Sequence, residues 1–204
     1  MQTRISLREG LKPFVPETAL EPVLVWIGNR PVQLRITRGR VSKLGDYRPP
    51  QNGYSHRISV NGDLNPYEFL ITLAHEIAHM EVWEKYGRKV RPHGDTWKHQ
   101  FAVKLGELLE MKVFPKEMEP HIRKQIMNPK ATSKADAKLT RALDEHNEEK
   151  GGVFLEDLPA GTVFSLIDGR RFRKEEKLRK WYRCVSLDNR RIYRISPVAR
   201  VKPM

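Results

Sequence analysis

The chain has 204 residues, with 38 Lys and Arg against 25 Asp and Glu, giving a formal net charge of +13 and a pI near 10.0. No apolar run approaches the roughly 18 residues of a membrane-spanning helix, so we expect no membrane association. A single cysteine, Cys184, excludes an internal disulfide framework and a Cys-rich zinc module. The start of the chain lacks the apolar region of a secretory signal. We therefore expect a cytoplasmic protein.

The positive charge is concentrated toward the end of the chain. Residues 169–204 contain 13 Lys and Arg and 3 Asp and Glu, whereas the other 168 residues contain 25 and 22. This change in composition predicts two functional units. A strongly basic segment favours a polyanionic partner such as nucleic acid.

Apolar periodicity and turn signals predict the elements of residues 1–127. They are a helix over 17–28 that Pro22 weakens, strands over 32–37, 43–47 and 56–60, a helix over 66–86, a helix that Asp95 or Thr96 caps and that runs to about residue 111, and a helix over 115–127. The helix over 66–86 has the clearest start, because Asn65 suits the N-cap, Pro66 the first helical position and Glu68 the third. Gly87 marks its end.

The remainder of the chain changes in character. Residues 128–152 are polar and predict a linker or a solvated helix. Residues 153–204 contain the short segments TVFSLID, KWYRCVSL and RRIYRI, which are rich in β-branched and aromatic residues and are bounded by turn signals. We therefore expect a small C-terminal antiparallel β module.

The sequence His75-Glu76-Ile77-Ala78-His79 carries the sharpest chemical signal. Residues four apart lie on one face of a helix, so His75 and His79 can bind one Zn²⁺. Glu76 lies one step round the helix, where it can take a proton from a metal-bound water. This is the H-E-x-x-H pattern of zinc metalloproteases.

A catalytic zinc needs a third protein ligand and one open position. His93 is the best candidate, because it lies in the loop between the two long helices and Gly94 allows close backbone approach. Glu107 and Glu110 are carboxylate alternatives, and His99 is the competing histidine. The MEVW sequence after the motif excludes the metzincin pattern.

The segment LITLAHEIAHM and the downstream His93-Gly94-x-x-Trp97 resemble the two motifs of the SprT-like family, over roughly residues 14–127. The resemblance implies an α+β fold with a minimal zincin domain: a small mixed sheet, an active-site helix and a supporting helix. It also implies that His75, His79 and His93 bind one catalytic zinc and that Glu76 is the general base. Members of the family are associated with zinc-dependent proteolysis of DNA-bound or DNA-crosslinked proteins in DNA repair.

The C-terminal module departs from the family. Many SprT-like proteins carry a zinc ribbon with paired cysteines, and here Tyr182-Arg183-Cys184 has no second cysteine after it. One cysteine cannot form a Cys₄ site. We therefore expect a ribbon-like module that is held together by hydrophobic packing without metal.

This module interleaves basic and aromatic residues, which suits single-stranded or distorted DNA. The residues that we expect to contact nucleic acid are Arg170, Arg171, Arg173, Lys180, Trp181, Arg183, Arg190 and Arg191. The alternative is a solvated basic face whose aromatic residues form the core of the module.

The sequence thus predicts a zinc-dependent endopeptidase domain over 1–127, a connecting segment over 128–152 and a basic β module over 153–204. One alternative is a non-catalytic nucleic-acid-binding protein with a structural zinc, for which Glu107 would supply a fourth ligand. A second alternative is a metallopeptidase that acts on a protein regulator, with nucleic acid incidental.

Overall fold

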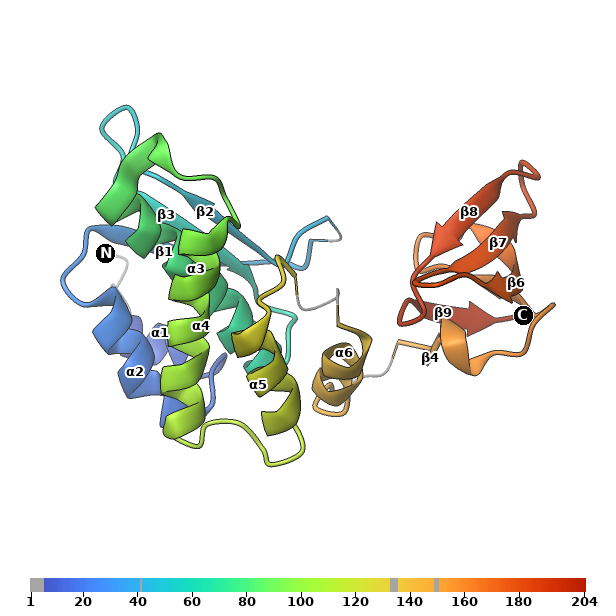
Figure 1. The fold of residues 1–204 in the computed structure, drawn as a ribbon, viewed down its shortest axis with the longest axis horizontal. Coiled ribbons are helices and arrows are strands. Elements are labelled where there is room, and N and C mark those ends of the chain that lie inside the picture. The colour runs from blue at the N-terminus through green and yellow to red at the C-terminus, as the bar shows by residue number, and fades with distance from the viewer. Residues whose placement is uncertain (1–5, 41, 133–135, 149–150) are drawn as a thin grey trace, which may run out of the picture. The chain divides into compact units, whose positions relative to one another are not determined.

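The computed structural model describes residues 6–40, 42–132, 136–148 and 151–204. It divides into a first unit that ends at His146 and a second unit that begins at Asn147. The first unit combines helices with a three-stranded sheet, and the second is built on a six-stranded antiparallel sheet (Figure 1). The expected α+β class is therefore confirmed.

The elements predicted over residues 17–127 occur in the predicted order, and the structure adds the short helix α1 (Leu7–Leu11), which the sequence did not predict. The helices of the first unit are α1, α2 (Glu17–Ile27), α3 (Pro66–Tyr86), α4 (Asp95–Glu110), α5 (Glu119–Met127) and α6 (Ala137–Asp144), with a 3-10 turn η1 (Gly87–Lys89), and its strands are β1 (Val32–Thr37), β2 (Gly45–Arg48) and β3 (His56–Asn61). The strand order is β1-β3-β2, with β1 parallel and β2 antiparallel to the central β3. The small sheet is mixed, as expected.

The start of α3 matches the sequence prediction. The Asn65 side chain accepts hydrogen bonds from the backbone N–H groups of Tyr67 and Glu68 at 3.1 and 2.9 Å, and Pro66 follows the cap. These bonds satisfy donors that have no partner inside the helix. Gly87 ends the helix with a φ of 60°.

No helix of the described residues is both long enough and apolar enough to span a membrane.

The starts of α4 and α5 correct the prediction. Gly94, rather than Asp95 or Thr96, occupies the N-cap of α4, and no side chain caps this helix. Asp95 is instead the first helical residue, where its charge is favourable to the helix dipole. Helix α5 begins at residue 119 because residues 115–118 form a turn in which the Met118 N–H bonds the Pro115 carbonyl at 2.9 Å.

Helix α3 runs through the centre of the first core. Its residues Leu70, Leu73 and Ile77 are fully buried, and Trp97 of α4 and Ile58 of β3 are at most 1% exposed beside them. A helix that is apolar on nearly all sides must be covered on nearly all sides. The sheet packs on one side of α3 and α4 on another (Figure 1), which fixes the helix rigidly.

Helix α6 corrects the prediction of a linker or solvated helix over 128–152. Leu139, Ala142 and Leu143 recur at helical spacing and are buried in the first core. The Asn65 side-chain amide also donates a hydrogen bond to the Leu143 carbonyl at 2.8 Å. The segment reads as polar because only one face of the short helix is apolar. The first unit therefore extends to His146.

The second unit contains more strands than the sequence predicted. They are β4 (Val153–Phe154), β5 (Val163–Ser165), β6 (Arg171–Lys177), β7 (Tyr182–Ser186), β8 (Ile192–Ile195) and β9 (Arg200–Pro203), with a 3-10 turn η3 (Leu155–Asp157). The strand order is β4-β9-β5-β6-β7-β8. The predicted segments contain β5, β7 and β8. Strand β6 was not predicted because most of its residues are charged, although Phe172 and Lys174 are buried and alternate with the exposed Arg171 and Arg173. The core of the unit includes Leu155, Phe164, Phe172, Cys184 and Val201.

Candidate metal centre and active-site cleft

Three histidine side chains converge at one point of the first unit. His75 and His79 come from successive turns of α3, and His93 comes from the loop before α4. Their Nε2 atoms form a triangle with sides of 3.1, 3.0 and 3.1 Å. The edge of a tetrahedral site with Zn–N bonds near 2.0–2.1 Å is about 3.3 Å. The three histidines could therefore hold a metal ion.

The chemistry of the cluster also favours a cation. Burial, followed by the neighbouring histidines, lowers the pKa of His75 to about 2, and burial lowers the pKa of His79 to about 4. The rings are therefore neutral near pH 7. A neutral Nε2 either donates or accepts, so three of them in one triangle cannot all be satisfied by one another. A metal ion would accept all three lone pairs.

Trp97 supports all three imidazoles. Its ring centroid lies 4.5 Å from that of His75, 5.2 Å from His79 and 4.7 Å from His93, and only 1% of its surface is exposed. Its indole N–H donates to the backbone carbonyl of His75 at 3.4 Å. The resemblance marked this aromatic position, and the packing explains it: a large buried ring limits the rotation of each histidine.

The backbone of His93 adopts a left-handed conformation with a φ of 59°. This conformation is uncommon outside glycine and is typical of functional sites. The turn is closed by a hydrogen bond from the Gly94 N–H to the Arg91 carbonyl at 3.0 Å. A Cβ at position 94 would lie 3.0 Å from that carbonyl oxygen, so glycine keeps the turn tight. The turn returns His93 to the first two histidines.

Glu76 is buried beside the strand β2 and is only 6% exposed. Its carboxylate accepts a hydrogen bond from the backbone N–H of Tyr47. Burial, and next the charge of Asp46, raise the pKa of Glu76 to about 8, although Arg40 and Lys43 oppose this shift. The group can therefore hold or release a proton near neutral pH.

Glu76 and the three histidines line one cleft of about 580 Å³. Strand β2 forms one wall with Gly45 and Tyr47. The Tyr47 hydroxyl is 2.9 Å from Nδ1 of His56, and its ring lies nearly parallel to that of His79, with centroids 6.3 Å apart. Residues 130–132 and Leu139, which the sequence assigned to a linker or solvated helix, line another wall. The cleft therefore belongs to the whole first unit.

The alternative ligands lie elsewhere. The Glu107 carboxylate accepts a hydrogen bond from the Trp26 indole at 2.5 Å and faces Lys104 at 3.6 Å. Glu110 and His99 are exposed on α4. Within the described residues, the metal-binding group contains no fourth His, Cys, Asp or Glu. His93, rather than Glu107 or Glu110, thus completes the group.

Four of the eight residues expected to contact DNA form ion pairs within the second unit. Arg170 pairs with Asp168 at 2.8 Å, Arg171 with Asp188 at 3.0 Å, Arg173 with Glu175 at 3.3 Å and Arg183 with Glu176 at 3.0 Å. Lys180, Trp181, Arg190 and Arg191 are exposed. Exposed ion pairs are weak, so phosphates could displace the carboxylates. The carboxylates would nevertheless compete with phosphates for these four arginines.

Several other basic and aromatic residues of the second unit are buried in its core or pack against it. Lys174 is buried, and its ammonium donates to the backbone carbonyls of Leu155 at 2.8 Å and Glu156 at 3.3 Å, and to that of Leu158. Phe172 is buried, and Tyr193 packs against it with ring centroids 5.3 Å apart. Phe172, and in part Tyr193, therefore belong to the core of the module, as the alternative to a DNA-binding role predicted.

The division into units changes the distribution of charge. Residues 147–204 contain 14 Lys and Arg and 8 Asp and Glu, a net of +6, whereas residues 1–146 contain 24 and 17, a net of +7. Acidic residues before position 169 fold into the same unit as the basic segment. The positive excess is thus shared by both units and is not a property of the second alone.

The sequence matches no protein-family model and no curated protein, and the structure matches no solved structure. The resemblance to the SprT-like family consequently rests on the two motifs.

Proposed function

We propose that this protein is a zinc-dependent endopeptidase whose substrates are proteins bound or crosslinked to DNA. The observation that carries the proposal is the triangle of His75, His79 and His93 beside the buried carboxylate of Glu76, in one cleft. In this interpretation α3 is the active-site helix, α4 is the supporting helix, and the first unit is a minimal zincin.

The donor set favours zinc over other ions. Three imidazoles, with no fourth ligand among the residues that the structure describes, leave one position open, which is typical of catalytic rather than structural zinc sites. A bound zinc ion supplies Lewis acidity, which lowers the pKa of water and polarises a carbonyl. The structural-zinc alternative requires a fourth ligand, and Glu107 is held by Trp26 and Lys104 instead.

Glu76 would act as the general base and then as the general acid. The Tyr47 N–H holds its carboxylate in place, and a pKa near neutrality lets it take a proton from the attacking water and give one to the leaving amine. Burial excludes competing solvent from the carboxylate.

The substrate would bind along β2. This strand lies at an edge of the sheet, because its neighbour in the sheet is β3 alone. An extended peptide can pair with such an edge through its backbone. Residues from β2 line the cleft that contains the histidines, so a peptide bound there would pass the metal site. Backbone pairing also predicts low sequence specificity.

The substitution Glu76→Gln tests the proposal. We expect the variant to keep one zinc per chain by metal analysis and to lose cleavage of a protein crosslinked to single-stranded DNA by a factor of about 10²–10⁴. Glu110→Gln, an exposed carboxylate on α4, is the matched control and should cleave like the parent. If Glu76→Gln cleaves as well as the parent, the mechanism is wrong. Equal cleavage of the same protein without DNA would favour the protein-regulator alternative.

A further inference from the structure

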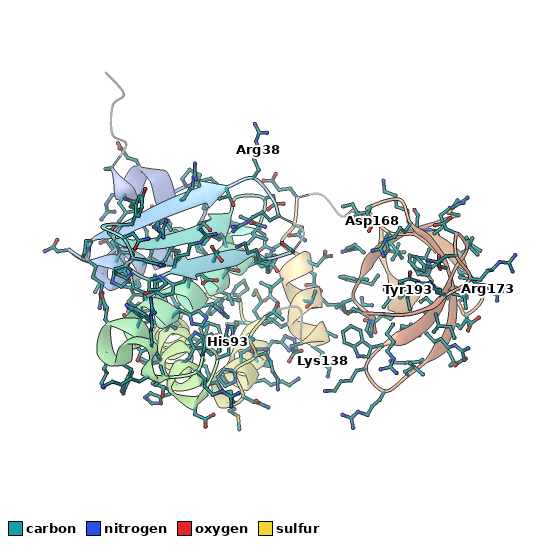
Figure 2. All side chains as sticks on the ribbon, turned by 90° about the horizontal axis from the view of Figure 1, so that it is seen from above. Arg38, His93, Lys138, Asp168, Arg173 and Tyr193 are labelled. Atoms are coloured by element: carbon teal, nitrogen blue, oxygen red, sulfur yellow. The ribbon has the colours of Figure 1, made fainter. Side chains whose placement is uncertain are left out.

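The three-stranded sheet of the first unit has two different faces. Ile58 and Val60 of β3 are buried against the core, whereas the alternate residues Arg57 and Ser59 point away from it. Strand periodicity places Arg35 of β1 on the same outward side. The long helices lie on one side of this sheet, and Arg38, one residue after β1, projects from the other (Figure 2).

The outward side is strongly basic. Strand register places Arg48 of β2 directly opposite Arg57 of β3, and Arg35 of β1 beside Ser59. Asp46 is the single acidic residue of the three strands, and it pairs with Arg48 at 2.9 Å and with Lys43 at 2.8 Å. Like charges directly opposite each other destabilise a sheet. Asp46 compensates the charge of Arg48, whereas the charge of Arg57 has no such partner among the residues that the structure describes.

Two of these arginines lack an internal acidic partner. Within the described residues, neither Arg35 nor Arg57 forms an ion pair, and the buried Nε of Arg57 has no hydrogen-bond acceptor. By contrast, Arg170, Arg171, Arg173 and Arg183 of the second unit are all paired with carboxylates. An anion that binds Arg35 and Arg57 would therefore not have to displace a carboxylate of the described part of the chain.

An aromatic ring lies beside these charges. Tyr54, in the turn between β2 and β3, is 58% exposed, and the Arg57 guanidinium lies 4.9 Å from its ring centroid. Guanidinium groups bind phosphates, and exposed aromatic rings stack on unpaired bases. A strip of arginines with an adjacent ring matches a single strand better than an acidic peptide, which offers no base to stack.

We propose that this surface, formed by Arg35, Arg48, Arg57 and Tyr54 and termed here the arginine face, binds single-stranded nucleic acid. The arginines contact phosphates, and Tyr54 stacks on a base. On β2, Arg48 lies on this face and the adjacent Tyr47 lines the cleft. If the proposed function holds, a protein attached to the bound strand is held next to the cleft. The binding itself does not depend on peptidase activity.

Fluorescence anisotropy of a labelled single-stranded oligonucleotide with the full-length Glu76→Gln protein tests the proposal without any cleavage. We expect Arg35→Ala/Arg57→Ala to weaken binding by about tenfold or more and to reduce the slope of log affinity against log salt by about 1.4. The matched control is Lys116→Ala/Arg123→Ala, which also removes two positive charges. Both positions are exposed: Lys116 precedes α5 and Arg123 lies within it. Equal effects of the two double variants would overturn the proposal.

A second variant tests stacking and remains informative if the arginine variant folds poorly. We expect Tyr54→Ala to weaken binding about tenfold and Tyr54→Phe to retain it. DNA and RNA strands distinguish the two sources of the ligand, and a duplex should bind less tightly because its bases are not free to stack. Poly-glutamate binding as tight as that of the oligonucleotide, with no effect of Tyr54→Ala on either ligand, would overturn the proposal.

Discussion

Gly45 of β2 and Glu76 of α3 are in such close contact that no side chain fits between them. A Cβ at position 45 would overlap Oε1 of Glu76 and would lie 2.8 Å from Cγ2 of Thr72 and 2.9 Å from Cγ of Glu76. These distances are too short for ordinary van der Waals contact. The strand and the helix approach closely here, and this approach lets the Tyr47 N–H reach the Glu76 carboxylate.

Gly45→Ala should therefore displace Glu76 without removing a metal ligand. Under the proposed function, we expect zinc content near that of the parent and a loss of cleavage of about 10-fold to 100-fold, because misplacement of the general base by about 1 Å is costly. Gly106→Ala is the matched control, since a Cβ at this position in α4 meets nothing within 4 Å and alanine favours the helix by about 1 kcal/mol. Unchanged activity of Gly45→Ala would contradict the role of this contact.

The metal-free protein should lose stability as the pH falls from 6.5 to 4.5. Burial lowers the pKa values of His75 and His79 to about 2 and 4, so in this range the unfolded chain binds these two protons and the folded chain does not. Glu76, with its pKa raised to about 8, has the opposite effect and binds one proton only when folded. For these three groups the net is one proton, or about 1.4 kcal/mol of unfolding free energy lost per pH unit. Burial also lowers the pKa values of His93 and His56, which adds to the loss.

Urea denaturation of chelator-treated protein at several pH values measures this slope. In His75→Gln/His79→Gln the two histidine contributions are absent, so the loss of stability per pH unit should be clearly smaller than in the parent. A parent slope that the double substitution leaves unchanged would show that these histidines are not neutral in the folded state.

Asp136 should be required for the docking of α6 on the first core. Its carboxylate accepts the N–H groups of Lys138 and Leu139 at 3.0 and 3.3 Å and pairs with Lys124 at 2.8 Å. We expect Asp136→Ala to lower the free energy of unfolding by about 1–2 kcal/mol and Asp136→Asn by less, because asparagine retains the cap. Lys138→Ala, an exposed change on the same helix, should stay within about 0.5 kcal/mol. Equal stabilities of Asp136→Ala and the parent would show that neither the cap nor the ion pair of this carboxylate stabilises the first unit.

Lys174 should stabilise the second unit through its buried ammonium. Lys174→Met removes the donor to the carbonyls of Leu155, Glu156 and Leu158 and leaves these acceptors short of partners. We expect a loss of about 2–4 kcal/mol in the unfolding transition of this unit, measured by calorimetry of the full chain. The exposed Lys202→Met serves as the control, and matching transitions would refute the role of the ammonium.

The sequence located the site because its signals are local. Helical spacing places His75 and His79 on one face, and the cap at Asn65 sets the start of the helix that carries them. His93 was a good candidate for the third ligand because it lies in the loop between two packed helices, and such a loop can bring its residues back to the first helix. The left-handed backbone of His93 could not be read from spacing, and the motif marked Trp97 without showing that its ring packs against the histidines.

The amino-acid pattern was enough to predict the α+β class, the two histidines and the carboxylate of α3, and a β module over residues 153–204. Which charges have partners depends on contacts between residues that are distant in the sequence. Arg171 at the start of β6 pairs with Asp188, 17 residues later in the turn after β7, and Arg48 and Arg57 face each other because the register of β2 and β3 requires it. Charge is a property of a residue, whereas its availability to a ligand depends on which residues the fold places around it.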